Sequence, residues 1–272
     1  GTLYVIPRTN NSAFTHNDPQ EGHPSTVHIT TDEGNVREFI HGSRATNPVD
    51  QWPDPDVYVN YMGQSLSGSE NRNINRTYPG KADGTLTEMM SYGIVQLINT
   101  ENIDVTVDLH EASPEYPVIN ALIAHERAMN LASNVVVDMQ MEGVQISLEP
   151  SPTDLRGLTH RELGDHTDTL ALLMEAPNPA QGRLRDRTDE ALVLTGKSET
   201  YVKAGEIGQL YVPYDENGWP IEVRCARHVF GIERILANYS EMYEEPIIVT
   251  GMPSYDELVK NGMGPYLNEP TT

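Results

Sequence analysis

The alternation of short apolar segments with longer helical ones most constrains what this chain can fold into. Strand-like runs rich in Val, Ile and Leu occur at 105–109, 118–124, 144–148 and 169–175. Helical periodicity occurs at 86–100, 125–142 and 229–243. Strands that alternate with helices form a sheet covered on both faces. We therefore expect a three-layer α/β/α fold with a mixed, mostly parallel sheet.

The segments outside this core have weaker patterns. Residues 3–6 resemble a buried strand, 150–168 a loop, 209–224 a hairpin, and 246–272 a C-terminal tail. The chain starts at Gly1 without a Met, inside the first of these segments. We therefore expect one domain over residues 1–272 that lacks its N-terminal segment.

The charge of the chain excludes some partners. Its 40 acidic and 18 basic residues give a formal charge of −22, which disfavours nucleic acid and anionic membrane surfaces. No apolar run reaches the roughly 20 residues of a membrane span. Cys225 is the single cysteine, so no disulfide can form within the chain. The acidity and the apparent processing favour a periplasmic or extracellular location over a cytoplasmic one.

His110 ends the apolar run that begins at Val105, and the acidic residues Asp108 and Glu111 lie on either side of it. Functional groups collect at the carboxyl ends of strands in α/β sheets. Imidazole is a good zinc ligand, and a neighbouring carboxylate can orient its second nitrogen. The sequence leaves open whether Glu111 orients His110 or faces solvent, and whether His110 is only a partly buried residue at a strand end.

Two further polar positions have the same ambiguity. Asn75 and Arg76 are adjacent in a polar segment, and such a pair can hold a carboxylate through the amide and the forked guanidinium. Glu175 ends the apolar run 170–174, where burial would raise its pKa toward the range of a general base. The Asn75–Arg76 pair is also compatible with an ordinary polar loop, and Glu175 with an ordinary strand end.

Together the three segments resemble the succinylglutamate desuccinylase/aspartoacylase family, which is related to the zinc carboxypeptidases. Residues 75–80 are Asn-Arg-Thr-Tyr-Pro-Gly, similar to the family's Asn-Arg-x-aromatic-Pro-Gly motif. Residues 108–110 are Asp-Leu-His, similar to its strand that ends in a zinc ligand. Residues 175–182 resemble the segment that holds its catalytic Glu. The order and approximate spacing also agree, and the resemblance covers roughly residues 1–182.

The resemblance implies a zinc-carboxypeptidase-like fold and the hydrolysis of an amide bond. His110 would bind Zn²⁺, and Glu175 would be the general base. The substrate would carry a free carboxylate, as an N-acyl amino acid or a peptide C-terminus does. Asn75 and Arg76 would hold this carboxylate. The further candidates for substrate contact are Arg72, Arg44, His160 and His166.

One element of the family is absent from the sequence. The family takes two further zinc ligands from a His-x-x-Glu motif, and none of the nine histidines here is followed by an acidic residue at the third position. One histidine cannot complete a site that needs three protein ligands. A separate N-terminal fragment or partner chain could supply a His and a Glu. Alternatively, other side chains complete the site, or the chain is an inactive binding or structural subunit. The histidines considered for completion are His16, His23, His28, His160 and His166.

Overall fold

The computed structural model describes residues 1–17, 24–244 and 246–270. Within these ranges, the central sheet has four strands in the order β5-β8-β6-β7. They are β5 (Val105–Ala112), β6 (Ala121–Ala124), β7 (Ser147–Pro150) and β8 (Leu170–Pro177). β5 pairs with β8 and β6 with β7 in parallel, whereas β6 and β8 are antiparallel. The predicted α/β class with a mixed, mostly parallel sheet is therefore confirmed.

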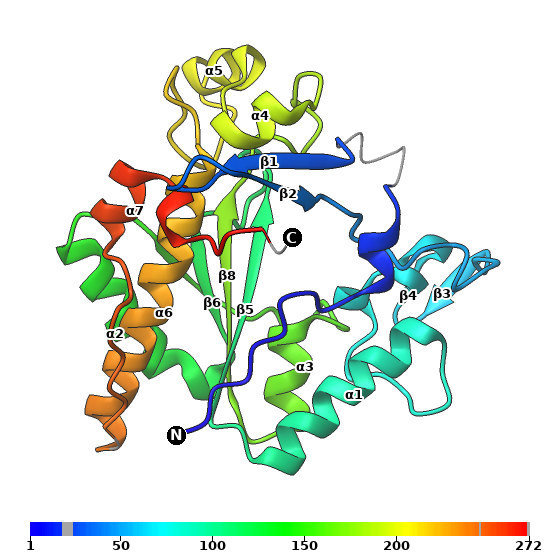
Figure 1. Cartoon of the computed structure of the whole chain (residues 1–272). Helices are drawn as coiled ribbons and strands as arrows, with labels where there is room; N and C mark the ends of the chain where they lie inside the picture. Colours follow the sequence, from blue (N-terminus) through cyan, green and yellow to red (C-terminus); the bar gives the residue numbers. More distant parts are fainter. Residues whose placement is uncertain (18–23, 245, 271–272) are drawn as a thin grey trace.

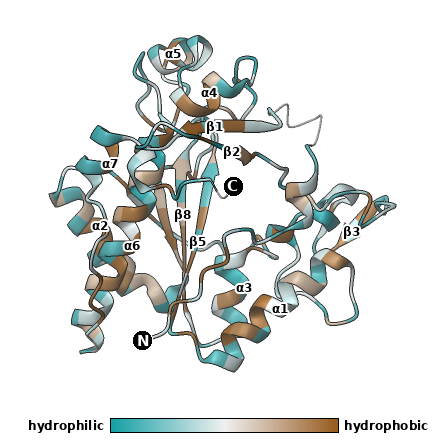
Figure 2. Cartoon of the chain, viewed as in Figure 1, coloured by the Kyte–Doolittle hydropathy of each residue, from teal (hydrophilic) through white to brown (hydrophobic). Residues whose placement is uncertain are grey.

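Helices lie on both sides of this sheet (Figure 1). One side carries α2 (Met129–Met141) and α6 (Ile221–Tyr243), and the other carries α1 (Leu86–Glu101) and α3 (Thr159–His166). The larger hydrophobic core includes Leu122 and Val135, and joins the sheet to α2 and α6. A smaller core around Leu163 includes residues of α1 and β8. Strand β8 is mostly brown in Figure 2, as expected for a strand covered on both faces.

The start of α1 follows from its sequence. The Thr85 hydroxyl accepts a hydrogen bond from Glu88 N at 3.3 Å, and the Glu88 carboxylate accepts one from Thr85 N at 2.9 Å. This reciprocal pair satisfies two backbone donors that have no partner within the helix. At the other end, Asn102 adopts a left-handed conformation with φ 50°. The helix predicted over 86–100 is therefore confirmed.

Smaller elements surround the sheet and its helices. Two antiparallel hairpins are formed by β1 (Thr26–Thr30) with β2 (Val36–Ile40), and by β3 (Val57–Val59) with β4 (Ser65–Ser67). The short helices are α4 (Glu190–Thr195), α5 (Glu199–Glu206) and α7 (Tyr255–Asn261). The 3₁₀ turns are η1 (Ser12–Thr15), η2 (Gly68–Arg72), η3 (Ile74–Arg76), η4 (Glu126–Ala128) and η5 (Gly264–Tyr266). Among the described residues, no helix combines the length and the apolar character needed to cross a membrane.

Three sequence predictions of local structure are wrong. Residues 3–6 form no strand, because no neighbouring strand pairs with them, and Leu3 is 80% exposed. The predicted loop 150–168 contains α3, whose buried residues are largely polar and so show no apolar periodicity. The predicted hairpin at 209–224 is absent, because helix α6 begins at Ile221, directly after Pro220. Cys225 accordingly lies in a helix.

Candidate active site

The carboxyl ends of β5 and β8 bring His110 and Glu175 together. The two residues are partners in the parallel register of these strands, so their side chains leave the same face of the sheet. Asp108 lies two residues before His110 and shares that face. His110 Nε2 is 2.9 Å from Asp108 Oδ2, and His110 Nδ1 is 3.9 Å from Glu175 Oε2. The predicted metal ligand and the predicted base are therefore neighbours.

Burial and mutual charge shift the pKa values of these groups. Burial raises the pKa of Glu175 to about 7, against the opposing effect of the His110 charge. Burial lowers the pKa of His110, but the charge of Asp108 and its hydrogen bond outweigh burial and raise the value to about 9. A carboxyl group with a pKa near 7 suits a general base at neutral pH. A metal ion that binds His110 must displace a proton from it.

Glu111 points away from the cluster formed by His110, Asp108 and Glu175, although it is the next residue after His110. Its Oε1 accepts a hydrogen bond from Arg224 Nε at 2.8 Å, and its Oε2 accepts one from Asn178 Nδ2 at 2.6 Å. Adjacent strand residues face opposite sides of a sheet. Glu111 therefore neither orients His110 nor simply faces solvent, and the carboxylate that contacts His110 belongs to Asp108.

The predicted carboxylate clamp, which consists of Asn75 and Arg76, lies in η3. Arg76 Nη1 donates to the Asn75 carbonyl oxygen at 2.6 Å, and Arg76 Nε is 3.8 Å from Glu70 Oε2. Arg76 is close enough to His110 for its charge to oppose the rise in the pKa of His110. Arg44, whose side chain is 68% exposed, approaches the second carboxylate oxygen of Glu70, with Arg44 Nη2 3.6 Å from Glu70 Oε1. The Glu70 carboxylate therefore lies between two of the predicted substrate-binding arginines.

Arg72, the other candidate arginine, is buried in an internal ion pair. Its Nε and Nη2 donate to the two carboxylate oxygens of Asp54 at 2.8 and 3.0 Å. Its Nη1 donates to the Thr46 carbonyl oxygen at 2.8 Å. These contacts hold the 45–54 segment against η2. Arg44 and Arg76 are thus the more accessible candidates for contact with a substrate.

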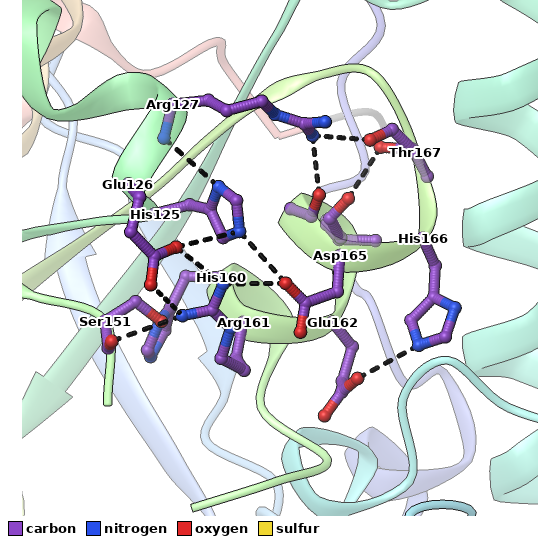
Figure 3. Close-up of polar contacts among 12 residues, drawn as sticks. His125, Glu126, Arg127, Ser151, His160, Arg161, Glu162, Asp165, His166 and Thr167 are labelled. Carbon is purple, nitrogen blue, oxygen red and sulfur yellow. Dashed lines mark hydrogen bonds and ion pairs between the residues drawn. The ribbon is translucent and has the colours of Figure 1, made fainter. Parts of the chain in front are cut away.

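Helix α3 brings one of its two histidines to the cluster. His160 Nδ1 is 2.7 Å from Ser151 Oγ, and its pKa falls to about 4, first because of burial and then because of the positive charge of His110. His160 is therefore a neutral imidazole near His110. His166 instead lies 3.2 Å from Glu162 Oε2 and contacts the edge of the Tyr61 ring. Figure 3 shows this separation along the helix.

Ion pairs hold α3 in place (Figure 3). Arg161 binds both carboxylate oxygens of Glu126, at 2.9 and 2.7 Å, and also Asp165 Oδ1 at 2.7 Å. Arg156 binds both oxygens of the fully buried Glu162, at 2.7 and 2.8 Å. Ion pairs therefore fix the position of this short helix, whereas packing of apolar residues fixes the position of α2.

We expect Glu162→Ala to lower the free energy of unfolding by about 3 kcal/mol, because it leaves the Arg156 guanidinium with Asp165 as its remaining partner and the buried Gly157 N–H without its acceptor. Chemical denaturation measures this change. The matched control is Glu142→Ala, which removes an exposed carboxylate 3.2 Å from Arg234 and should cost less than about 1 kcal/mol. Equal losses for the two variants would contradict this account of α3.

The described residues fit one ligand position of a zinc site but not a complete site. Asp108 holds one ring nitrogen of His110, which leaves Nδ1 facing Glu175, and carboxylate-bound histidines are common zinc ligands. Within the described ranges, no three His, Cys, Asp or Glu side chains are grouped to hold a metal ion. Of the alternative ligands, His28 on β1 is bound by Glu38 of β2 and by Glu190, the first residue of α4. His23 lies outside the described residues.

Two residues of the cluster were not chosen from the sequence. Asp108 had a usable signal, because a residue two positions before His110 on a strand must share its face. Thr159 had none. It hydrogen-bonds to Asn75, which lies 84 positions earlier, and a contact over that separation leaves no local pattern.

A comparison of the chain with protein-family models, with curated proteins and with solved structures finds no match. The geometry of the cluster and the three sequence motifs are therefore the features of the chain that indicate a function.

Proposed function

We propose that this chain is the major part of a zinc-dependent hydrolase that cleaves an amide bond in a carboxylate-bearing substrate. The observation that carries the proposal is the pairing of Glu175 with His110 in the register of β5 and β8. A carboxyl group with a raised pKa lies beside a histidine that Asp108 already orients. This pairing, with helices on both sides of the sheet, also supports our proposal of a zinc-carboxypeptidase-like fold.

Each group in the cluster has a chemical task in this proposal. Glu175 takes a proton from the attacking water and returns it to the leaving nitrogen. Asn75 and Arg76 hold the free carboxylate of an N-acyl amino acid or of a peptide C-terminus. Arg44 and the neutral His160 line the approach to the scissile bond. Zinc, when bound through His110, would polarise the scissile carbonyl and lower the pKa of water.

A second polypeptide segment completes the metal site in this proposal. His110 is one ligand, and three protein ligands are usual for catalytic zinc. Strand β5 is at the edge of the described sheet, since only β8 pairs with it. A segment that pairs with this edge in parallel would end beside His110. We therefore propose an N-terminal fragment or partner chain that supplies a His and a Glu there.

Intact mass and metal content of the purified material test this proposal. The expected result is a co-purifying fragment that carries His-x-x-Glu, with one zinc ion per complex and amidase activity on a panel of N-acyl amino acids. A lone 30.3 kDa species without zinc or activity would contradict it. That result would favour the alternative, a non-catalytic binding or structural subunit.

The proposal also includes the cellular compartment of the protein. A formal charge of −22 favours solubility, and we propose a periplasmic or extracellular location. Fractionation of the native source, with the chain followed by mass spectrometry, tests it.

A further inference from the structure

The side chain of Asn75 caps a helix that begins far away in the sequence. Thr159 is the first residue of α3, and the preceding Leu158 provides no side-chain cap. Asn75 Oδ1 accepts a hydrogen bond from Thr159 N at 2.8 Å and one from Thr159 Oγ1 at 2.9 Å. The first amide groups of a helix have no partner within it. Asn75 therefore satisfies one of them through its carbonyl end.

This cap fixes which end of the Asn75 amide is available to a ligand. An asparagine side chain has an oxygen that only accepts hydrogen bonds and a nitrogen that only donates them. Two donors from Thr159 hold the oxygen against α3. The Nδ2 group must then face away from the helix, and within the described ranges no hydrogen bond engages it. A carboxylate needs such a donor.

Thr159 also lies near the group that orients His110. Its hydroxyl acts to lower the pKa of the Asp108 carboxyl and opposes the rise that burial causes in the pKa of Tyr78. A threonine hydroxyl has one proton and two lone pairs. Its proton is donated to Asn75 Oδ1, at 2.9 Å, as is the backbone N–H of Thr159, at 2.8 Å. One residue thus contacts Asn75 and lies near the carboxylate beside His110.

We propose that Thr159 is a positioning residue that turns the Asn75 amide group toward the carboxylate of the substrate. The proposal rests on the proposed function, in which Asn75 and Arg76 bind that carboxylate. Thr159 does not touch the substrate. It acts by holding Asn75 Oδ1 and so presenting the donor end of the Asn75 amide.

Binding of N-acetylglycine to the full chain, followed by NMR titration, tests the proposal. This compound is the smallest N-acyl amino acid, and N-acetylglycinamide is the matched ligand without a carboxylate. The unmodified chain should bind N-acetylglycine at least about tenfold more tightly than the amide, since hydrogen bonds to charged groups contribute about 1.5–3 kcal/mol. Thr159→Val should remove most of this difference and shift the side-chain amide signals of Asn75. Thr159→Ser should restore the preference for N-acetylglycine to within about threefold of the unmodified chain. It should also return the Asn75 side-chain amide signals to their positions in the unmodified chain.

Two further variants separate the possible outcomes. Asn75→Asp keeps the oxygen that caps α3 but loses the donor, so it should abolish the preference for N-acetylglycine. If Asn75→Asp binds normally, or if the unmodified chain shows no preference, the clamp of the proposed function is wrong and the role of Thr159 is wrong with it. If Asn75→Asp loses binding and Thr159→Val keeps it, the role of Thr159 alone is overturned. Thr159→Ala, which like Thr159→Val keeps the backbone N–H and loses the hydroxyl, replaces Thr159→Val should the latter fail to fold.

Discussion

Glu175→Gln should lower amide hydrolysis by about 10²–10⁴-fold in the zinc-loaded, complete protein, the range that general acid–base groups contribute. Glutamine keeps the shape of the side chain but cannot take a proton from water. The His110 side chain, 3.9 Å away, keeps its contact with Asp108. Zinc should therefore remain bound while turnover is lost. Steady-state kinetics and elemental analysis of the same preparation measure the two quantities.

The control for this experiment is Glu149→Gln on β7, the same substitution on a partly exposed strand residue away from His110. It should leave turnover within about twofold, as expected for a change that touches no site group. Near-normal turnover of Glu175→Gln would remove Glu175 from the role of base. Loss of zinc from Glu175→Gln would instead assign Glu175 to the metal. The two outcomes therefore distinguish a base from a ligand.

The cluster also shows how far sequence reasoning extends. The apolar runs that end in His110 and Glu175 predict two strands, and parallel strands bring such ends to one edge of a sheet. The apolar pattern predicts each strand separately. It does not predict that His110 and Glu175 are partners in the register of β5 and β8. The face on which Asp108 and Glu111 lie follows from strand alternation alone. Strand alternation is therefore sufficient to assign the contact with His110 to Asp108 and not to Glu111.

The segment 150–168 shows where sequence reasoning stops. Helix α3 has eight residues, among them His160, Arg161 and Glu162, and all three are buried. A polar segment of this kind predicts a loop, because periodicity arguments count apolar residues. Its burial depends on partners at Glu126, Ser151 and Asn75, which lie 9 to 84 positions away. The partners at Glu126 and Asn75 lie 35 and 84 positions away, and no short window of sequence contains them together with this helix.

Asp108→Asn should weaken zinc binding by about 10–100-fold in the complete protein, the usual effect of removing a carboxylate that orients a ligating histidine. The carboxylate holds His110 Nε2 at 2.9 Å, fixes the ring and makes it a better ligand. His110→Ala should have the larger effect and prevent stoichiometric zinc binding. Competition with a chelator of known affinity measures both changes.

Glu111→Gln is the matched control, because it removes one negative charge from the residue next to His110 but on the opposite face of β5. Its contacts with Arg224 and Asn178 make a loss of stability expected, and thermal denaturation will report it. Zinc affinity should change by less than about threefold, since Glu111 does not contact the His110 ring. Equal losses of zinc affinity for Asp108→Asn and Glu111→Gln would mean that net charge, and not the contact with His110, governs the metal. A loss confined to Asp108→Asn would identify its contact with the His110 ring as the source of the effect.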